Sequence, residues 1–165
     1  MHIRKTIFAA FVSGMMISSL AAAAQTGGLQ SLVTDRADVL KPATEETLLK
    51  QLQQEEKESG VKIYVLTVKT FDQKEIDQLV EGAGKIPISK GKKGGSVLLV
   101  ASPGSKKIKI VVSDELEGRL TNDLCTQLIK SEIVPSLKKG DYDTGLRAGV
   151  NALQKALKGN YVSRD

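Results

Sequence analysis

Apolar positions along the chain follow two different periods, and the change of period predicts a mixture of strands and helices. Residues 61–68 and 96–101 are almost continuously apolar or β-branched, which is typical of strands buried on both faces. Residues 107–112 alternate at first between lysine and apolar side chains, and a Pro-Gly-containing segment at 102–105 precedes them. This spacing predicts a tight turn, so the last two strands should form an antiparallel hairpin, with residues 96–101 central in the sheet.

Helical periodicity predicts two helices in the first half of the chain. The first should begin at Pro42, whose missing N–H is not needed in a first helical turn, and should stop at Gly60. The second is expected over residues 73–83, where apolar side chains recur on one stripe. A loop rich in lysine and glycine, at residues 85–94, should connect it to the next strand.

The last third of the chain predicts two more helices. One is expected over residues 122–133, after which Pro135 and Gly140 should break the chain, and Asp141 is placed to cap the last helix. The core-facing residues of that last helix are spaced by four, three and four positions: Leu146, Val150, Leu153 and Leu157. These elements together predict an α/β fold, layered α/β/α, with a mixed sheet that contains a central hairpin and is flanked by about four helices.

The first 24 residues have the three parts of a secretory signal peptide in order. Arg4 and Lys5 lie in a short basic head that precedes an uncharged apolar stretch at residues 7–23. Ala22 and Ala24 then give the small-x-small pattern of a cleavage site. The alternative is an apolar segment that stays attached as an anchor, but the stretch is slightly short for a span of roughly 20 residues. We therefore expect a periplasmic or secreted protein with no transmembrane anchor after cleavage.

The rest of the chain divides into a polar lead-in at residues 25–32, one domain at 33–158 and a tail at 159–165. The net charge of +5 falls to +3 when Arg4 and Lys5 leave with the signal. Three lysine clusters lie in the domain, at residues 90–93, 106–109 and 138–139. The first two have no interleaved aromatic residue, so we expect no nucleic-acid groove. These lysines should form a solvated surface or contact points for a partner.

Composition excludes the nucleophile and metal sites that need histidine or several cysteines. The one histidine, His2, lies in the predicted signal peptide. Cys-His and Ser-His-Asp catalysis and histidine zinc sites are therefore excluded. Cys125 is the only cysteine, so it cannot form an internal disulfide, and its apolar neighbours predict a buried core residue.

Oxygen ligands gather in the segments that should connect strands to helices. Ca²⁺ binds six to eight carboxylate and carbonyl oxygens supplied by flexible loops. The alternative for each residue is helix capping or plain solvation. The candidate metal ligands are Asp35 and Asp38 before the first helix, Glu117 after the hairpin, and Asn122 and Asp123 at the start of the third helix.

Five segments in order resemble the TPM-domain family. Residues 33–40 read V-T-D-R-A-D-V-L and resemble the family pattern V-x-D-x-A-x-x-L. Residues 60–68 and 95–101 resemble its two core strands, and L-E-G-R-L-T at 116–121 resembles its L-E-G-x-L-T segment. P-S-L-K-K-G-D-Y at 135–142, followed by Gly-Leu, is similar to the family segment before the last helix. The resemblance implies an exported α/β/α domain. Members have been linked to photosystem II repair, receptor modulation, acid phosphatase activity and Ca²⁺ binding.

The chain departs from the family pattern at the predicted site. The family has G-Y-G before L-E-G, whereas this chain has Ser113, Asp114 and Glu115. The family acid after this segment aligns with Asn122, and the family tryptophan is missing because the chain has no tryptophan. These changes imply that the site is either rebuilt or lost.

Three functions remain open from the sequence. The first is an exported accessory or binding module that contacts an envelope or secreted protein, with Ca²⁺ at the acidic rim. The alternative is a metal-assisted, acid phosphatase-like hydrolase that uses Asp35, Asp38, Glu117 and Asp123. The third is a structural interaction domain with a degenerate site. The domain has no histidine outside the predicted signal peptide and no recognisable nucleophile motif. Both observations favour a protein that is not an enzyme.

Overall fold

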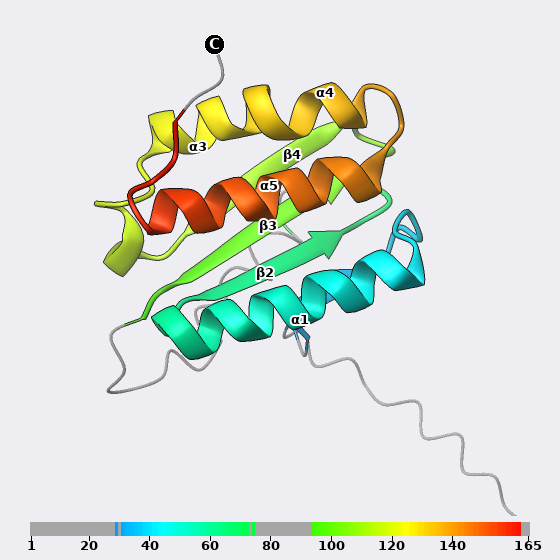
Figure 1. Cartoon of the computed structure of the whole chain (residues 1–165). Helices are drawn as coiled ribbons and strands as arrows, with labels where there is room; N and C mark the ends of the chain where they lie inside the picture. The colour runs from blue at the N-terminus through cyan, green and yellow to red at the C-terminus, as the bar shows by residue number, and fades with distance from the viewer. Residues whose placement is uncertain (1–28, 30, 73, 75–93, 163–165) are drawn as a thin grey trace, which may run out of the picture.

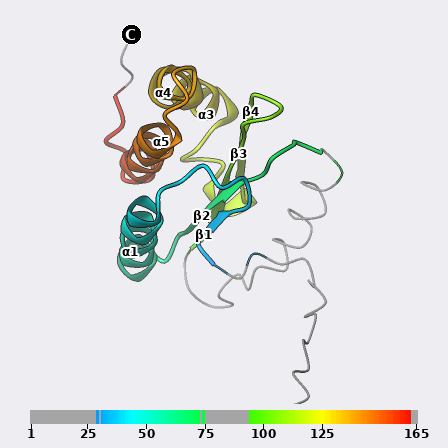
Figure 2. The ribbon, with the colours of Figure 1, turned by 90° about the vertical axis from the view of Figure 1, so that its right-hand side faces the viewer.

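The computed structural model describes residues 29, 31–72, 74 and 94–162. A four-stranded sheet forms from β1 (Val33–Asp35), β2 (Lys62–Thr67), β3 (Ser96–Ser102) and β4 (Lys107–Val112). The strands lie in the order β1-β2-β3-β4; the first three are parallel and β4 is antiparallel to β3. The predicted α/β class and the β3–β4 hairpin are therefore confirmed. Within the described sheet β3 is interior and β4 lies at the edge opposite β1 (Figure 2).

The described helices cover one face of this sheet (Figure 1, Figure 2). They are α1 (Pro42–Ser59), α3 (Asn122–Leu128), α4 (Val134–Leu137) and α5 (Tyr142–Leu157). The helix predicted over 73–83 lies outside the described residues, apart from Lys74, and so does almost all of the loop predicted over 85–94. The predicted signal peptide lies outside them as well. Within the described part of the chain, no helix has the length and apolar content needed to cross a bilayer.

The central strands β2 and β3 are buried on both faces. Ile63, Val97 and Leu99 point toward the helices and join the main core, whereas Leu66 and Val100 belong to a second cluster on the opposite face. Because successive side chains of a strand point to opposite faces, double burial requires an almost continuous apolar run. This explains why the strands were recognisable without strict alternation.

Strand β1 is absent from the sequence prediction, although its residues belong to the recognised opening motif. It is three residues long and pairs in parallel with β2, from Val33 beside Val65 to Asp35 beside Thr67. A segment this short has no measurable period, so only its neighbour in space identifies it as a strand.

The ends of α1 follow the local signals in the sequence. Pro42 occupies the first turn, and Gly60 terminates the helix in the left-handed region with φ 75°. Its backbone N–H donates to the carbonyl of Glu56 at 2.9 Å. A left-handed residue at this position is a common helix end, and glycine adopts it without a steric penalty.

The prediction that Pro135 breaks the chain is wrong. Helical backbone continues from α3 through a π-helical turn, η2 (Ile129–Ile133), into α4, and the chain leaves the helix only near Gly140, which has φ 77°. In η2 the N–H of Val134 donates to the carbonyl of Ile129, five residues earlier. The wider π turn gives the proline ring room where an α-helical turn would clash, which is why the helix tolerates Pro135.

Helix α5 packs closely on this long helical segment. A Cβ atom at Gly145 would lie 2.1 Å from Leu137 Cδ1, and one at Gly149 would lie 2.6 Å from Ile133 Cδ1. The predicted cap is confirmed, because Asp141 Oδ1 accepts the N–H of Thr144 at 3.0 Å. The predicted core residues of α5 are also buried: Leu146, Val150, Leu153 and Leu157.

Candidate functional site

Asp35, the first predicted metal ligand, is occupied by hydrogen bonds within the protein. It lies at the carboxyl end of β1, where its Oδ2 accepts the N–H groups of Val39 at 2.9 Å and Leu40 at 2.8 Å. The hydroxyl of Thr67 donates to Oδ1. The N–H of Ala37 in turn donates to the Thr67 hydroxyl oxygen at 3.1 Å. Asp35 therefore joins the end of β1 to β2 and shapes the turn that leads to α1.

Asp38 lies in the same turn, but its side chain is exposed. Its φ of 57° places it in the left-handed region, which aspartate tolerates better than most residues. This position fits a role in the turn, the alternative that the sequence left open.

The other three predicted ligands lie at the opposite end of the sheet. Strand β4 runs back along β3, and the N–H of Ser113 donates to the carbonyl of Ser96 at the amino end of β3. Asp35, by contrast, lies in register with Thr67 and Ala101 at the carboxyl ends. At 3.3 Å per residue the two ends are separated by about 17 Å.

The structure therefore does not bring Asp35 and Asp38 together with Glu117, Asn122 and Asp123 on one rim. In the residues that the structure describes, no three His, Cys, Asp or Glu side chains are grouped so that they could hold a metal ion. Asn122 and Asp123 are exposed at the start of α3. Thr121 caps that helix, since its hydroxyl oxygen accepts the N–H of Leu124 at 3.3 Å.

Glu115, one of the acids that departs from the family pattern, is also held by local contacts. Its own backbone N–H and the hydroxyl of Ser113 lower the pKa of its carboxyl. The residue is exposed, and it follows β4 in the 3-10 turn η1 (Asp114–Leu116). The carboxylate therefore stays ionised to a lower pH than a free glutamate.

A cavity of about 360 Å³ opens beside the carboxyl end of β3. Lysines from three elements line it: the turn after β3, strand β4 and the end of α4. We call it the lysine groove, after Lys106, Lys107 and Lys138. Ile108 and Leu137 give it an apolar lining. Its volume lies in the lower part of the usual range for ligand sites, about 300–1,000 Å³.

The charges of the lysine groove are not neutralised within the described part of the chain. All three lysines are exposed, and none of them takes part in an ion pair there. The ammonium of Lys107 lies 5.5 Å from the centroid of the Phe71 ring, a cation–π contact that holds it near the end of the hairpin. Phe71 packs against the cluster on the sheet face opposite the helices, so the Lys107 ammonium lies on that face. The cations on the same side as Ile108 and Leu137 are Lys106 and Lys138.

The acids nearest in sequence to the groove, Asp141 and Asp143, are used to anchor α5. The backbone N–H of Thr144 is the main cause that lowers the pKa of Asp141. Burial alone would raise the pKa of Asp143, but the N–H and charge of Lys41 and the hydroxyl of Thr44 hold it below its usual range. The Lys41 N–H donates to Asp143 Oδ1 at 3.0 Å. Asp143 therefore holds the start of α5 against the segment before α1, and Asp141 caps α5.

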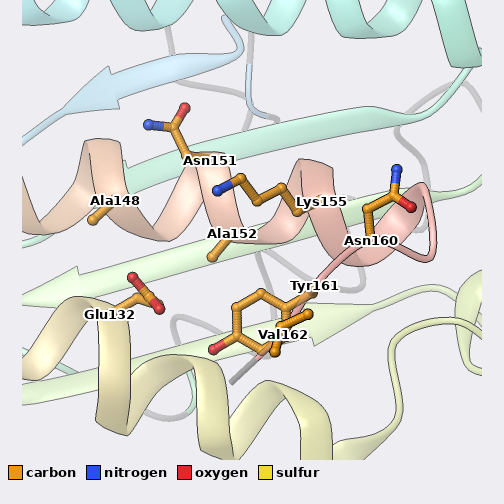
Figure 3. A pocket seen from close by; sticks show the side chains of 8 residues that line it. All are labelled: Glu132, Ala148, Asn151, Ala152, Lys155, Asn160, Tyr161 and Val162. Carbon is orange, nitrogen blue, oxygen red and sulfur yellow. The ribbon is translucent and has the colours of Figure 1, made fainter. Parts of the chain in front are cut away.

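A second cavity, of about 400 Å³, lies between η2, α5 and the segment that follows α5. Figure 3 shows Asn151 and Lys155 on α5 and the ring of Tyr161 next to Val162. The Tyr161 hydroxyl lies 2.9 Å from Ser131 Oγ, and Gln51 Nε2 donates to Asn151 Oδ1 at 2.6 Å. Because Tyr161 bonds to η2 and packs against the main core, we interpret this cavity as part of the surface on which the last described segment packs.

Cys125 is a buried core residue, as predicted. Burial raises the pKa of its thiol, and its side chain is only 7% exposed. We expect native protein at pH 8 to react with a disulfide reagent on the order of 100-fold more slowly than urea-unfolded protein. The absorbance of the released thiolate measures both rates. Equal rates would show that the thiol is accessible and nucleophilic.

Sequence reasoning found the lysines of this groove only as separate clusters. Residues 106 and 107 were candidate partner contacts, but nothing linked them to Lys138, some thirty positions later. One signal in the sequence could have indicated the groove. Lysines follow the strand β3 and precede α5, and α/β sheets bind their ligands just outside the carboxyl ends of the strands.

Comparison with known proteins agrees with this fold. Residues 33–156 match the family model described as the TPM domain. No curated protein matches the chain. The solution NMR structure of the N-terminal domain of a protein from P. gingivalis is 26% identical with a TM-score of 0.64, covering 81% of this chain and 86% of that one.

Two further solved structures show the same fold at lower identity. The BA42 protein of Bizionia argentinensis is 18% identical with a TM-score of 0.60, covering 76% of this chain and 86% of that one. The N-terminal domain of cg2496 from Corynebacterium glutamicum is 13% identical with a TM-score of 0.53, covering 82% and 83%. Since the family model spans most of the sequence, the chain belongs to the TPM-domain family.

Proposed function

We propose that this protein is an exported, non-enzymatic binding module of the cell envelope, which holds an acidic segment of a partner protein in the lysine groove. The observation that carries the proposal is the groove itself: exposed lysines from three elements line one cavity together with apolar side chains. Carboxylates of a partner would complement the ammonium groups, and apolar side chains would cover Ile108 and Leu137. The signal-like residues 1–24 support the exported location.

The same geometry argues against hydrolysis at this end of the sheet. The hydroxyl of Ser102 donates to the carbonyl of Lys69 at 3.2 Å, and the N–H of Ser105 donates to the Ser102 oxygen at 3.4 Å. Asp35 already accepts three hydrogen bonds. A nucleophile and a general base need to lie within hydrogen-bond reach of each other with the base free to accept a proton, and these two residues do not meet that need. We therefore propose binding without catalysis, and without Ca²⁺ held by the five residues named above.

Peptide binding tests the proposal. A labelled decapeptide of alternating glutamate and valine should bind, and its glutamine counterpart should bind at least about tenfold more weakly, a difference of about 1.4 kcal/mol. Fluorescence anisotropy at low and physiological salt measures both affinities, and screening should weaken only the acidic peptide.

A matched pair of variants locates the binding surface. Lys138 lines the groove and its neighbour Lys139 does not, although both are exposed. Lys138→Glu should weaken binding of the acidic peptide about tenfold or more, whereas Lys139→Glu should change it by no more than about twofold. Equal losses in the two variants would show that only the overall charge matters. No binding of the acidic peptide to the unaltered protein would overturn the proposed function.

A further inference from the structure

We propose that the acidic segment binds as an additional β-strand along the outer edge of β4, with one end in the lysine groove. This inference rests on the proposed function and adds the geometry of the complex. Lys107 and Ile108 belong both to the first positions of β4 and to the lining of the groove. A strand laid along β4 would therefore lead directly into the lysine groove.

The register of the hairpin identifies which backbone groups of β4 face outward. The N–H of Ser113 donates to the carbonyl of Ser96 at 2.9 Å, so this facing pair is a hydrogen-bonded pair of the ladder. Hydrogen-bonded and non-hydrogen-bonded pairs alternate along an antiparallel ladder. The next hydrogen-bonded pairs are therefore Leu98 with Val111, Val100 with Lys109 and Ser102 with Lys107.

The remaining β4 residues direct their N–H and C=O groups away from β3. They are Ile108, Ile110 and Val112. In the described sheet β4 pairs with β3 alone, and no hydrogen bond is found on its other side there. Figure 2 shows β4 at the end of the sheet farthest from β1. Three donors and three acceptors at alternate positions are the template that an added strand requires.

The side chains of β4 select the composition of that strand. Lys107 and Lys109 alternate with Ile108 and Ile110, so the lysines lie on one face of the sheet and the isoleucines on the other, against the main core. β4 contains neither proline nor glycine, and its six residues span about 20 Å. A partner that alternates acidic and apolar residues would pair carboxylates with the lysines and place apolar side chains beside the core.

A second copy of this chain fits the edge less well. Two β4 strands paired around a two-fold axis would bring the lysines of each copy onto the same face, directly or diagonally opposite one another. Like charges facing each other across a strand pair are destabilising. Charge complementarity therefore favours an acidic partner over self-association.

Hydrogen exchange measured by NMR on the whole protein tests the added strand. With the alternating Glu-Val decapeptide bound, the amides of Ile108, Ile110 and Val112 should exchange at least about tenfold more slowly. The amides of Lys109 and Val111 already donate within the hairpin, so their exchange should change much less. If exchange slows equally at both sets of amides, or slows at neither set, the added-strand geometry is wrong.

N-methylated peptides provide a second readout that leaves the protein unchanged. An added strand hydrogen-bonds through alternate residues only, so methylating the amides of one alternate set should weaken binding at least about tenfold. Methylating the other set should have little effect. If the acidic peptide binds and Lys138→Glu weakens it, but the two methylated peptides behave alike, the strand geometry is wrong and the proposed function stands. If the protein forms dimers without peptide and the peptide dissociates them, the edge of β4 belongs to a second copy of the chain. That result would overturn the inference.

Discussion

Replacing Asp35 by alanine should lower the free energy of unfolding by about 3 kcal/mol. The carboxylate accepts the N–H groups of Val39 and Leu40 and the hydroxyl of Thr67, which links the turn before α1 to strand β2. Hydrogen bonds to charged groups contribute about 1.5–3 kcal/mol each, and the lost bonds overlap in one turn, so the total falls below their sum. The N–H groups left behind are only partly able to find water, because this region is half-buried.

Two matched asparagine variants separate this structural role from a metal-binding role. Asp35→Asn keeps one carbonyl acceptor and should cost about 1–2 kcal/mol, whereas Asp38→Asn, at an exposed turn position, should change stability by less than about 0.5 kcal/mol. Urea unfolding with a common slope measures each change. A rise in stability on adding Ca²⁺ that both asparagine variants abolish would restore the metal hypothesis and contradict the structural account.

The fold was predictable where a local signal determines the structure. Gly60 ends α1 and Asp141 caps α5, and both residues act on backbone groups within one helical turn. The strands β2 and β3 were predictable because burial on both faces leaves a continuous apolar run. Pro135 was misjudged because the π turn η2, which the apolar pattern of the sequence does not indicate, precedes it and makes room for its ring.

The candidate site was less predictable because it depends on which end of the sheet each loop occupies. The hairpin prediction alone places Glu117 at the amino end of β3, but the end to which Asp35 belongs became clear only with β1. The lysine groove joins residues about thirty positions apart, and their proximity follows from the return of the chain through α3 and α4. The sequence showed which side chains are acidic or basic, whereas only the three-dimensional structure showed which of them lie close together.

Removing the positive charge of Lys158 should destabilise the protein by about 2 kcal/mol, although this residue lies on the surface. Its ammonium lies 3.2 Å from Glu55 Oε2, and the Glu55 side chain is only 1% exposed. Among the residues that the structure describes, the other oxygen of Glu55 has no hydrogen-bond partner. Lys158→Ala would leave a buried carboxylate without its counter-ion, which costs several kcal/mol when both partners are buried and less here because Lys158 is 49% exposed.

Replacing the buried acid should have the opposite consequence. Glu55→Met removes both the charge and the unpartnered oxygen from the space between α1 and the end of α5, so stability should stay within about 1 kcal/mol of the unaltered protein or rise. In the Glu55→Met background, Lys158→Ala should then cost less than about 0.5 kcal/mol, because the charge that Lys158 compensates is gone. Glu58→Gln, at an exposed position 3.8 Å from the same ammonium, is the control and should change stability little.

Thermal and urea unfolding of the four members of this cycle measure the coupling between Glu55 and Lys158. A coupling energy above about 1 kcal/mol supports a stabilising ion pair that holds the end of α5 to α1 through one buried charge. If Lys158→Ala costs the same with glutamate or methionine at position 55, the lysine acts through its aliphatic stem, and the ion pair adds nothing to stability. If Glu55→Met is instead strongly destabilising, the carboxylate has a partner that stabilises it beyond Lys158. The variant pair therefore distinguishes a costly buried charge, tolerated only because Lys158 neutralises it, from a carboxylate that stabilises the native packing of the two helices.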